Sequence, residues 1–227
     1  MPNMTQFRDR RTSVDVVFDH LRDEITSLRL LPGDKISEAD IAAQFGVSRQ
    51  PVRDAFSRLE NLGLLLIRPQ RATEVRRFSA REIIKSRFVR SALEAEVLRR
   101  AAAECDAIGA AHLDANLTLQ AAIVDAGDYA KFGMLDYQFH QTLCDIAKVD
   151  FAFEVIKQEK ANVDRLCMLS LSKKNRMAVL LEDHKAIAAC VTNGDGEAAV
   201  AAGMLHLSRL DATIEAISTA HPNYFDP

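Results

Sequence analysis

The second half of the chain carries four side chains that together could bind a metal ion. They are one aspartate and three histidines, Asp136, His140, His184 and His206. Asp136 and His140 are four residues apart, which in a helix places both on one face about one turn apart. The two later histidines stand among apolar residues, in the runs LLEDHKAI and GMLHL. Three imidazoles and one carboxylate could surround a divalent cation and leave positions open for water or a small anion.

Spacing alone does not show that these four side chains converge. A single histidine on an apolar helix face is more often a core or surface residue than a metal ligand. An imidazole-rich set also accepts several ions, including zinc, nickel and manganese, so the sequence leaves the identity of the ion open. The other three histidines lie outside this pattern, and we assign them no role.

A second group of residues that could do chemistry lies near the N-terminus, in the run SEADIAAQFGVSRQPVRDAFSR. One side of its second helix would expose Arg49, Gln50, Arg53 and, further along, Arg58. Arginine pairs bidentately with guanine or phosphate, and glutamine with adenine. A helix that exposes such residues from its first turns is suited to enter a major groove, although solvated arginines on any helical hairpin are the alternative interpretation.

Two short helices joined by a tight turn would position these side chains. Ser37 and Asp40 form a capping-box pattern at the start of the first helix. Gly46 suits the left-handed conformation that ends a helix, and Ser48 is a typical N-cap for the second. Apolar residues recur along the second helix at a spacing of three or four and predict its buried side, namely Val52, Phe56, Leu59 and Leu62.

The residues after this hairpin argue against the alternative. A short apolar strand is predicted from Leu64 to Ile67, a turn at 68–71 and a return strand from Ala72 to Arg76. Such a β-hairpin, tipped with arginines, would contact phosphates or the minor groove beside the recognition helix. With an amphipathic helix from Val14 to Leu28 packed behind it, the pattern predicts a winged helix-turn-helix.

Composition is that of an ordinary globular protein, with 48% apolar and 27% charged residues and a net charge of −3. The charge is unevenly distributed, because residues 49–77 hold seven basic and three acidic side chains.

The four cysteines, Cys105, Cys144, Cys167 and Cys190, are scattered without a CxxC spacing. Free thiols in a reducing cytosol fit this usage better than disulfides. With no membrane-spanning apolar run and no signal peptide, we expect a cytoplasmic protein.

From residue 80 onward the apolar periodicity predicts helices and no strand. Six are expected, at about 80–104, 107–125, 128–146, 150–172, 173–191 and 197–218. Short connections between long amphipathic helices imply an antiparallel bundle. We therefore expect a mainly α protein with a winged domain over residues 1–78 and an all-α bundle of about six helices over residues 79–227. The polar tail, 221–227, is expected to be disordered.

At its N-terminal end, over residues 14–77, the chain resembles the DNA-binding domain of GntR-type bacterial transcription regulators. The resemblance rests on the run LRLLPGDKISEADIAAQFGVSRQPVRDAFSRLENLGLLLIRPQRATEV. It implies operator contacts by Lys35, Arg49, Gln50, Arg53, Gln70 and Arg71; Ser48 and Arg58 complete our candidate set. The family usually has glycine after the tip arginine of the wing, where this chain has Ala72, and that puts the wing contact in doubt.

Residues 80–218 resemble the helical ligand-binding domain called FCD, found in the FadR subgroup of GntR regulators. The matching segments are Arg90-x-x-x-Glu94, Asp136-Tyr-Gln-Phe-His140, Glu182-Asp-His184-x-x-Ile187, and Gly194-Asp195 followed by Met204-Leu-His206. In such domains the aspartate and three histidines bind a divalent metal. The resemblance therefore implies that the four candidate ligands do converge.

Together these features predict a metabolite-responsive transcription regulator. A homodimer would bind a pseudo-palindromic operator, and a small organic acid would complete the coordination of the metal. Arg90 is a candidate anchor for the acid's carboxylate, although it could instead pair with Glu94, and Arg165 is a weaker candidate.

Two alternatives remain open at this point. One is a metal-dependent hydrolase or lyase that uses the His₃Asp set, although no acid/base partner stands at a recognisable spacing and the winged domain would be unexplained. The other is a metal-ion sensor, in which the ion itself is the effector.

Overall fold

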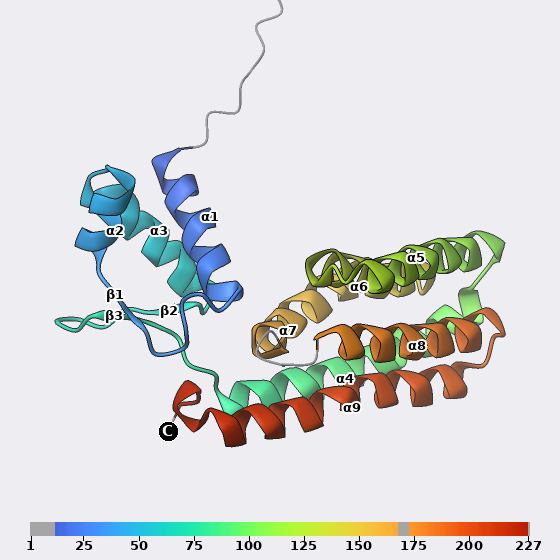
Figure 1. Cartoon of the computed structure of the whole chain (residues 1–227). Helices are drawn as coiled ribbons and strands as arrows, with labels where there is room; N and C mark the ends of the chain where they lie inside the picture. Colours follow the sequence, from blue (N-terminus) through green and yellow to red (C-terminus); the bar gives the residue numbers. More distant parts are fainter. Residues whose placement is uncertain (1–11, 168–172, 227) are drawn as a thin grey trace, which may run out of the picture. The chain divides into compact units, whose positions relative to one another are not determined.

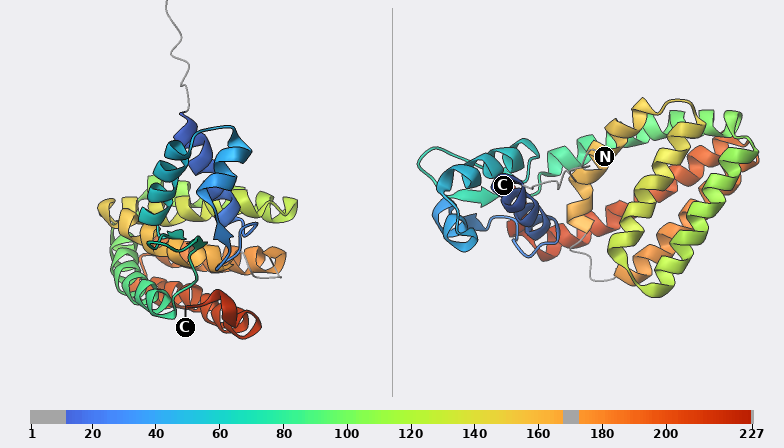
Figure 2. Two further views of the ribbon diagram at one scale, coloured as in Figure 1. Left: turned by 90° about the vertical axis from the view of Figure 1, so that its left-hand side faces the viewer. Right: turned by 90° about the horizontal axis from the view of Figure 1, so that it is seen from above.

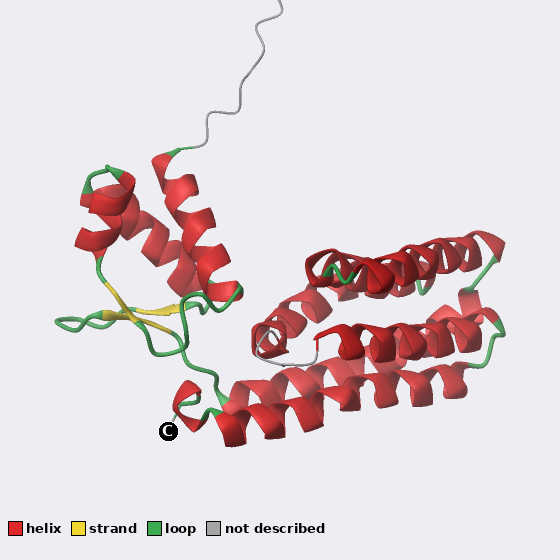
Figure 3. Ribbon diagram, in the orientation of Figure 1, coloured by secondary structure: helices red, strands yellow, loops and turns green. Residues whose placement is uncertain are grey.

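The computed structural model describes residues 12–167 and 173–226, and the chain divides into two compact units. The first unit comprises Met1–Phe78 with Asn223–Pro227, and the second comprises Ser79–Pro222. The helices and strands of each unit are labelled in Figure 1 and coloured by type in Figure 3. Among the described residues, no helix is both long and apolar enough to cross a membrane.

The first unit is a winged helix-turn-helix, as predicted. Its helices are α1 Ser13–Thr26, α2 Glu38–Phe45 and α3 Arg49–Asn61, and its strands are β1 Lys35–Ile36, β2 Leu65–Leu66 and β3 Thr73–Val75. The strands form an antiparallel sheet in the order β1-β3-β2 (Figure 3). Side chains of all three helices and the three strands share one core, in which Val17, Val52 and Phe56 are fully buried. Strand β1 was not predicted, because two residues are too few for an alternating pattern to appear.

Local capping explains where these helices begin and end, with some differences from expectation. Thr12 and Asp15 form the full capping box, at the start of α1. Ser37 caps α2 by accepting a hydrogen bond from the amide of Ala39, at 3.2 Å, instead of the predicted pairing with Asp40. Gly46 ends α2 in the left-handed conformation, with φ of 63°. Because α3 ends at Asn61, Leu62 leaves the predicted buried face and its exposed fraction is 57%.

The second unit is an all-helical bundle whose six helices in the described residues match the predicted ones. They are α4 Ala80–Glu104, α5 Ala107–Ala126, α6 Tyr129–Ile146, α7 Phe151–Cys167, α8 Lys173–Thr192 and α9 Gly196–Ala220. The predicted continuation of α7 over 168–172 lies outside the described residues. Helix α4 packs against α7 and α9, while α5 packs against α6 and α8 (Figure 2). Phe139, Leu113 and Ile187 lie in the shared core.

The described part of the C-terminal tail, residues 221–226, is ordered, which corrects the expectation of disorder there; residue 227 lies outside the described residues. A 3₁₀ turn spans Pro222–Tyr224, after which the chain pairs with Phe78. The amide of Phe78 donates to the carbonyl of Tyr224 at 2.8 Å, and the amide of Asp226 donates to the carbonyl of Phe78 at 2.8 Å. The rings of Phe78 and Phe225 are 5.6 Å apart. Residues 223–226, predicted within the second domain, thus pack with the first unit.

Candidate metal centre and nucleic-acid interface

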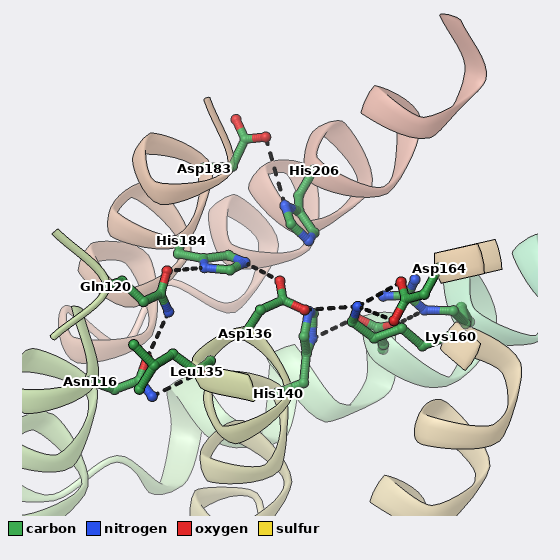
Figure 4. A network of polar contacts seen from close by, with 12 residues as sticks. Asn116, Gln120, Leu135, Asp136, His140, Lys160, Asp164, Asp183, His184 and His206 are labelled. Carbon is green, nitrogen blue, oxygen red and sulfur yellow. Dashed lines mark hydrogen bonds and ion pairs between the residues drawn. The ribbon is translucent and has the colours of Figure 1, made fainter. Parts of the chain in front are cut away.

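The bundle brings the four predicted metal ligands together. Asp136 and His140 lie on α6, His184 on α8 and His206 on α9 (Figure 4). One potential ligand atom from each lies within 4.8 Å of the other three. All four side chains are buried, and His184 is fully enclosed. The apolar stripe of α6, which includes Phe139, turns both Asp136 and His140 into the interior, as their spacing predicted.

Each histidine has a polar partner on the side away from the cluster. Nδ1 of His140 lies 3.1 Å from a carboxylate oxygen of Glu94, and Nδ1 of His184 lies 2.8 Å from Oε1 of Gln120. Nδ1 of His206 faces Asp183 at 3.7 Å, which is too long for a hydrogen bond (Figure 4).

The inward nitrogens of two histidines have no hydrogen-bond partner. Nε2 of His140 and Nε2 of His184 are both buried in this way, and the nearest oxygen of Asp136 is 3.3 Å from Nε2 of His184 in poor geometry. An unsatisfied buried nitrogen costs stability unless something binds it. Outer partners that orient inward lone pairs are the usual arrangement around a metal-binding histidine, so these residues fit a divalent metal.

The protonation states of the cluster also suit a metal. Burial alone would raise the pKa of the Asp136 carboxyl, but Lys160 and the neighbouring imidazoles hold that pKa well below its usual range. Burial lowers the pKa of His184, and lowers the pKa of His206 to about 4. At neutral pH Asp136 is therefore a carboxylate, and the imidazoles of His184 and His206 are neutral; these are the forms that coordinate a cation.

A small cavity of about 50 Å³ reaches this cluster. Its lining includes Asp136 and His206 together with Ser86, Arg90, Lys160 and Arg176. Nε of Arg90 donates to Glu94 at 2.7 Å, as the alternative interpretation anticipated, yet Nη2 of Arg90 is buried without a hydrogen-bond partner. Arg165, the weaker candidate anchor, is buried but does not line the cavity.

Lys160 is a residue of the site that was not predicted; its Nζ lies 2.8 Å from Oδ2 of Asp136 and 2.9 Å from Oδ1 of Asp164. A lysine is normally assigned to the surface, and here it is 8% exposed. The sequence did indicate that Lys160 is buried, because it follows Ile156 by four residues and precedes Val163 by three, the spacing of one helix face. All three lie on the buried side of α7.

Arg49, Gln50 and Arg53 of α3 are exposed, as predicted for DNA-contacting residues, and the last two engage nearby acidic residues. Arg53 donates to both oxygens of Glu38 on α2, at 3.0 and 3.3 Å, and the amide of Gln50 donates to Asp54 at 2.8 Å. Exposed pairs of this kind contribute only about 0–1 kcal/mol, so DNA can displace them at small cost. Ser48 stands at the N-cap position, but its hydroxyl makes no capping hydrogen bond.

The remaining DNA candidates lie elsewhere on the first unit. Arg58 pairs with Asp15 of α1 at 2.9 Å. Lys35 is an exposed residue of β1. At the wing tip, Gln70 adopts the left-handed conformation, with φ of 58°, and Arg71 is exposed. Ala72 does not adopt the left-handed conformation. Its backbone therefore does not need a glycine, the residue usual at this position in the family.

A winged helix-turn-helix with exposed basic residues on its recognition helix, followed in the chain by a helical bundle, is typical of DNA-binding transcription regulators. Comparison with known proteins gives the family. The family described as "Bacterial regulatory proteins, gntR family" matches residues 14–75, and the FCD domain matches residues 86–209. The chain belongs to the GntR family of regulators and carries an FCD domain.

The chain is also similar to individual bacterial regulators. The chain is 32% identical to the "HTH-type transcriptional repressor RspR" of Escherichia coli strain K12, over 97% of each protein. It is 32% identical to a "Probable D-xylose utilization operon transcriptional repressor" of Paenarthrobacter nicotinovorans, over 61% of each. Family and relatives are transcription regulators, not enzymes.

Solved structures share the fold. One is E. coli McbR/YncC, with a TM-score of 0.69 at 18% identity, covering 91% of this chain and 98% of that one. Another is a putative GntR regulator from Rhodococcus sp. RHA1, with a TM-score of 0.69 at 23% identity, covering 89% of this chain and 97% of that one. Within the family, the helix-turn-helix binds operator DNA and the FCD domain binds small effectors.

Proposed function

We propose that this regulator belongs to the FadR subgroup and that its FCD domain binds a divalent metal together with a small organic acid, which changes operator binding. The observation that carries the proposal is the set of four buried donors whose inward nitrogens, on His140 and His184, have no hydrogen-bond partner. Asp136 and His206 complete the proposed ligand set. The ion itself, whether zinc, nickel or manganese, would supply positive charge for an acidic effector.

The neighbouring cavity supports an acidic effector. A divalent ion with one carboxylate and three neutral imidazoles retains about one positive charge. Arg90 and Lys160 add two cationic groups to the cavity wall, and Nη2 of Arg90 is a donor without a hydrogen-bond partner. Guanidinium binds carboxylate bidentately, so Arg90 would hold an acid that also reaches the cluster. Lys160 replaces Arg165 as the second proposed anchor.

In the proposed mechanism, residues 1–78 bind DNA, and the helical bundle, predicted over 79–227, binds the effector and a second copy of the chain. Arg49, Gln50 and Arg53 would read bases in the major groove. Ser48, Lys35 and Arg58 would contact phosphates. The wing residues Gln70 and Arg71 would contact phosphates or the minor groove beside the recognition helix. A homodimer would present two recognition helices to a pseudo-palindromic operator. The acid would act by binding one arrangement of the dimer more tightly than another.

A thermal-shift screen of small organic acids on the metal-loaded full chain tests the proposal. A true effector raises the melting temperature through mass action, and it should do so only when metal is present. The double variant His140→Ala with His206→Ala should show neither the metal shift nor the acid shift. Operator titration with metal alone separates a metal-ion sensor from the proposed regulator, because a sensor would respond fully to the ion without any acid.

A further inference from the structure

We propose that Asn116 and Gln120, which are not metal ligands, are positioning residues that set the tautomer of His184 so that its Nε2 lone pair faces the cluster. This role depends on the proposed metal site, because the Nε2 lone pair matters only if a metal binds there. Both side chains come from α5, which supplies no ligand. Together with the carbonyl of Leu135 they form a buried hydrogen-bonded relay that ends on the imidazole (Figure 4).

Four groups in series make up this relay. The amide nitrogen of Asn116 donates to the carbonyl of Leu135 at 3.1 Å. The amide nitrogen of Gln120 donates to Oδ1 of Asn116 at 2.7 Å, and Oε1 of Gln120 lies 2.8 Å from Nδ1 of His184. Gln120 and His184 are fully buried, and Asn116 is 8% exposed. Solvent therefore offers little competition along the relay.

The direction of every hydrogen bond follows from its first member. A backbone carbonyl can only accept, so Asn116 must turn its NH₂ group toward Leu135 and its oxygen toward Gln120. Gln120 must then turn its NH₂ group toward Asn116, which leaves its oxygen facing His184. An oxygen in that position accepts a hydrogen bond, so Nδ1 of His184 carries the N–H and Nε2 carries the lone pair.

The relay opposes a competing tautomer. Oδ1 of Asp136 lies 3.3 Å from Nε2 of His184, and a carboxylate there would by itself favour a proton on Nε2. That proton would block coordination through Nε2. Ring stacking on Phe139, at 4.3 Å between centroids, fixes the plane of the imidazole but does not choose between the nitrogens. The choice is made by the amides of α5.

The experiment measures the His184 tautomer directly. Proton–nitrogen correlation NMR on the metal-free full chain distinguishes Nδ1–H from Nε2–H, and the His184 signals are assigned by their loss in His184→Ala. In the wild-type protein, His184 should carry its proton on Nδ1. Gln120→Leu removes the acceptor and should move His184 toward Nε2–H, whereas Gln120→Glu keeps an acceptor and should preserve Nδ1–H. Wild type found as Nε2–H, or Gln120→Leu left unchanged, would overturn the inference.

A second readout measures zinc affinity by competition with a chelator. Gln120→Leu should weaken binding by about 10–100-fold, the usual effect of losing an outer partner, while Gln120→Glu stays within a few-fold of wild type. Gln158→Leu, an exposed glutamine of α7, is the matched control and should change neither readout. Equal weakening by both Gln120 variants would indicate a packing effect and reject the tautomer role.

Failure of this inference is distinguishable from failure of the proposed function. If wild type and the His140→Ala, His206→Ala variant bind zinc equally weakly, the proposed metal site is wrong. The NMR measurement does not depend on metal and still decides whether Gln120 sets the tautomer.

Discussion

The ammonium group of Lys160 lies 2.8 Å from Oδ2 of Asp136, inside the helical bundle. Their side chains are 11% and 6% exposed, so each charge has lost most of its contact with water. The contact is an ion pair outside hydrogen-bonding geometry, and the carboxylate oxygen has no hydrogen-bond donor. Asp136 thus depends on nearby positive charge, supplied by Lys160 and, in the proposed holo-protein, also by the metal.

Replacing Lys160 should destabilise the metal-free protein more than the metal-loaded one. Lys160→Met leaves the buried Asp136 carboxylate unpaired, which costs roughly 3–5 kcal/mol of unfolding free energy when no other cation is near. A bound metal restores part of the lost attraction, so the loss should be smaller with metal present. Urea unfolding with chelator and with saturating zinc measures both values.

Lys157→Met is the matched control, because Lys157 is an exposed residue of α7 whose side chain is 53% accessible. It should change neither unfolding free energy by more than a few tenths of a kcal/mol. Identical losses for Lys160→Met with and without zinc would contradict the proposed proximity of a metal to Asp136.

The double variant His140→Ala with His206→Ala should lose its metal while keeping its helical content. Two of four ligands are removed from the interior, but the helices that carry them are held by an extensive apolar core. Elemental analysis gives the metal content and circular dichroism gives the helicity. His112→Ala, an exposed histidine of α5, should retain metal. Full metal retention in the double variant would refute the four-ligand site.

Arg53→Ala should weaken operator binding by about 1–3 kcal/mol, the range for loss of a bidentate base contact. Glu38→Gln should act in the opposite direction, because it releases Arg53 from its pair and removes a negative charge beside the recognition helix. Arg100→Ala, on the exposed side of α4, serves as the control. Titrations at one fixed salt concentration measure all three, and an unchanged Arg53→Ala affinity would reject the recognition-helix assignment.

Phe225→Ala should loosen the tail at Phe78. The aromatic pair contributes about 0.5–1.5 kcal/mol beyond its buried area, and it flanks the two backbone hydrogen bonds that join the tail to Phe78. Amide hydrogen exchange at Phe78 should therefore accelerate. Asn223→Ala keeps the backbone carbonyl that accepts from Arg77 and should leave exchange at wild-type rates. Unaltered exchange in Phe225→Ala would show that the tail does not protect this amide.

The capping box of α1 should give the first unit a pH-dependent contribution to stability. Hydrogen bonds from Thr12 and Arg58 lower the pKa of Asp15 to about 2 from a reference value of 3.8. A lowered pKa stabilises the folded state above the unfolded value, so the contribution is complete above about pH 4 and is lost as pH falls toward 2. The stability difference between wild type and Asp15→Asn should shrink over that interval. A difference independent of pH would exclude this contribution.

The helices and the winged domain could be predicted because their determinants are local. Capping residues such as Asp128 and Asp195, left-handed glycines such as Gly46, and apolar residues at helical spacing act within a few positions of each other. Asp136 and His140 also share a face through local geometry. The partnership with His184 and His206 came from the resemblance to a family pattern, not from spacing.

By itself, then, the sequence determined the elements and the identities of the chemical groups, because helix periodicity and capping operate along the chain. Only the tertiary structure decided that Lys160 is buried on Asp136, that Gln120 and Asn116 orient His184, and that the tail pairs with Phe78. Each of those contacts joins residues far apart in sequence, and a polar side chain is stable inside a protein only where a distant partner compensates its lost hydration.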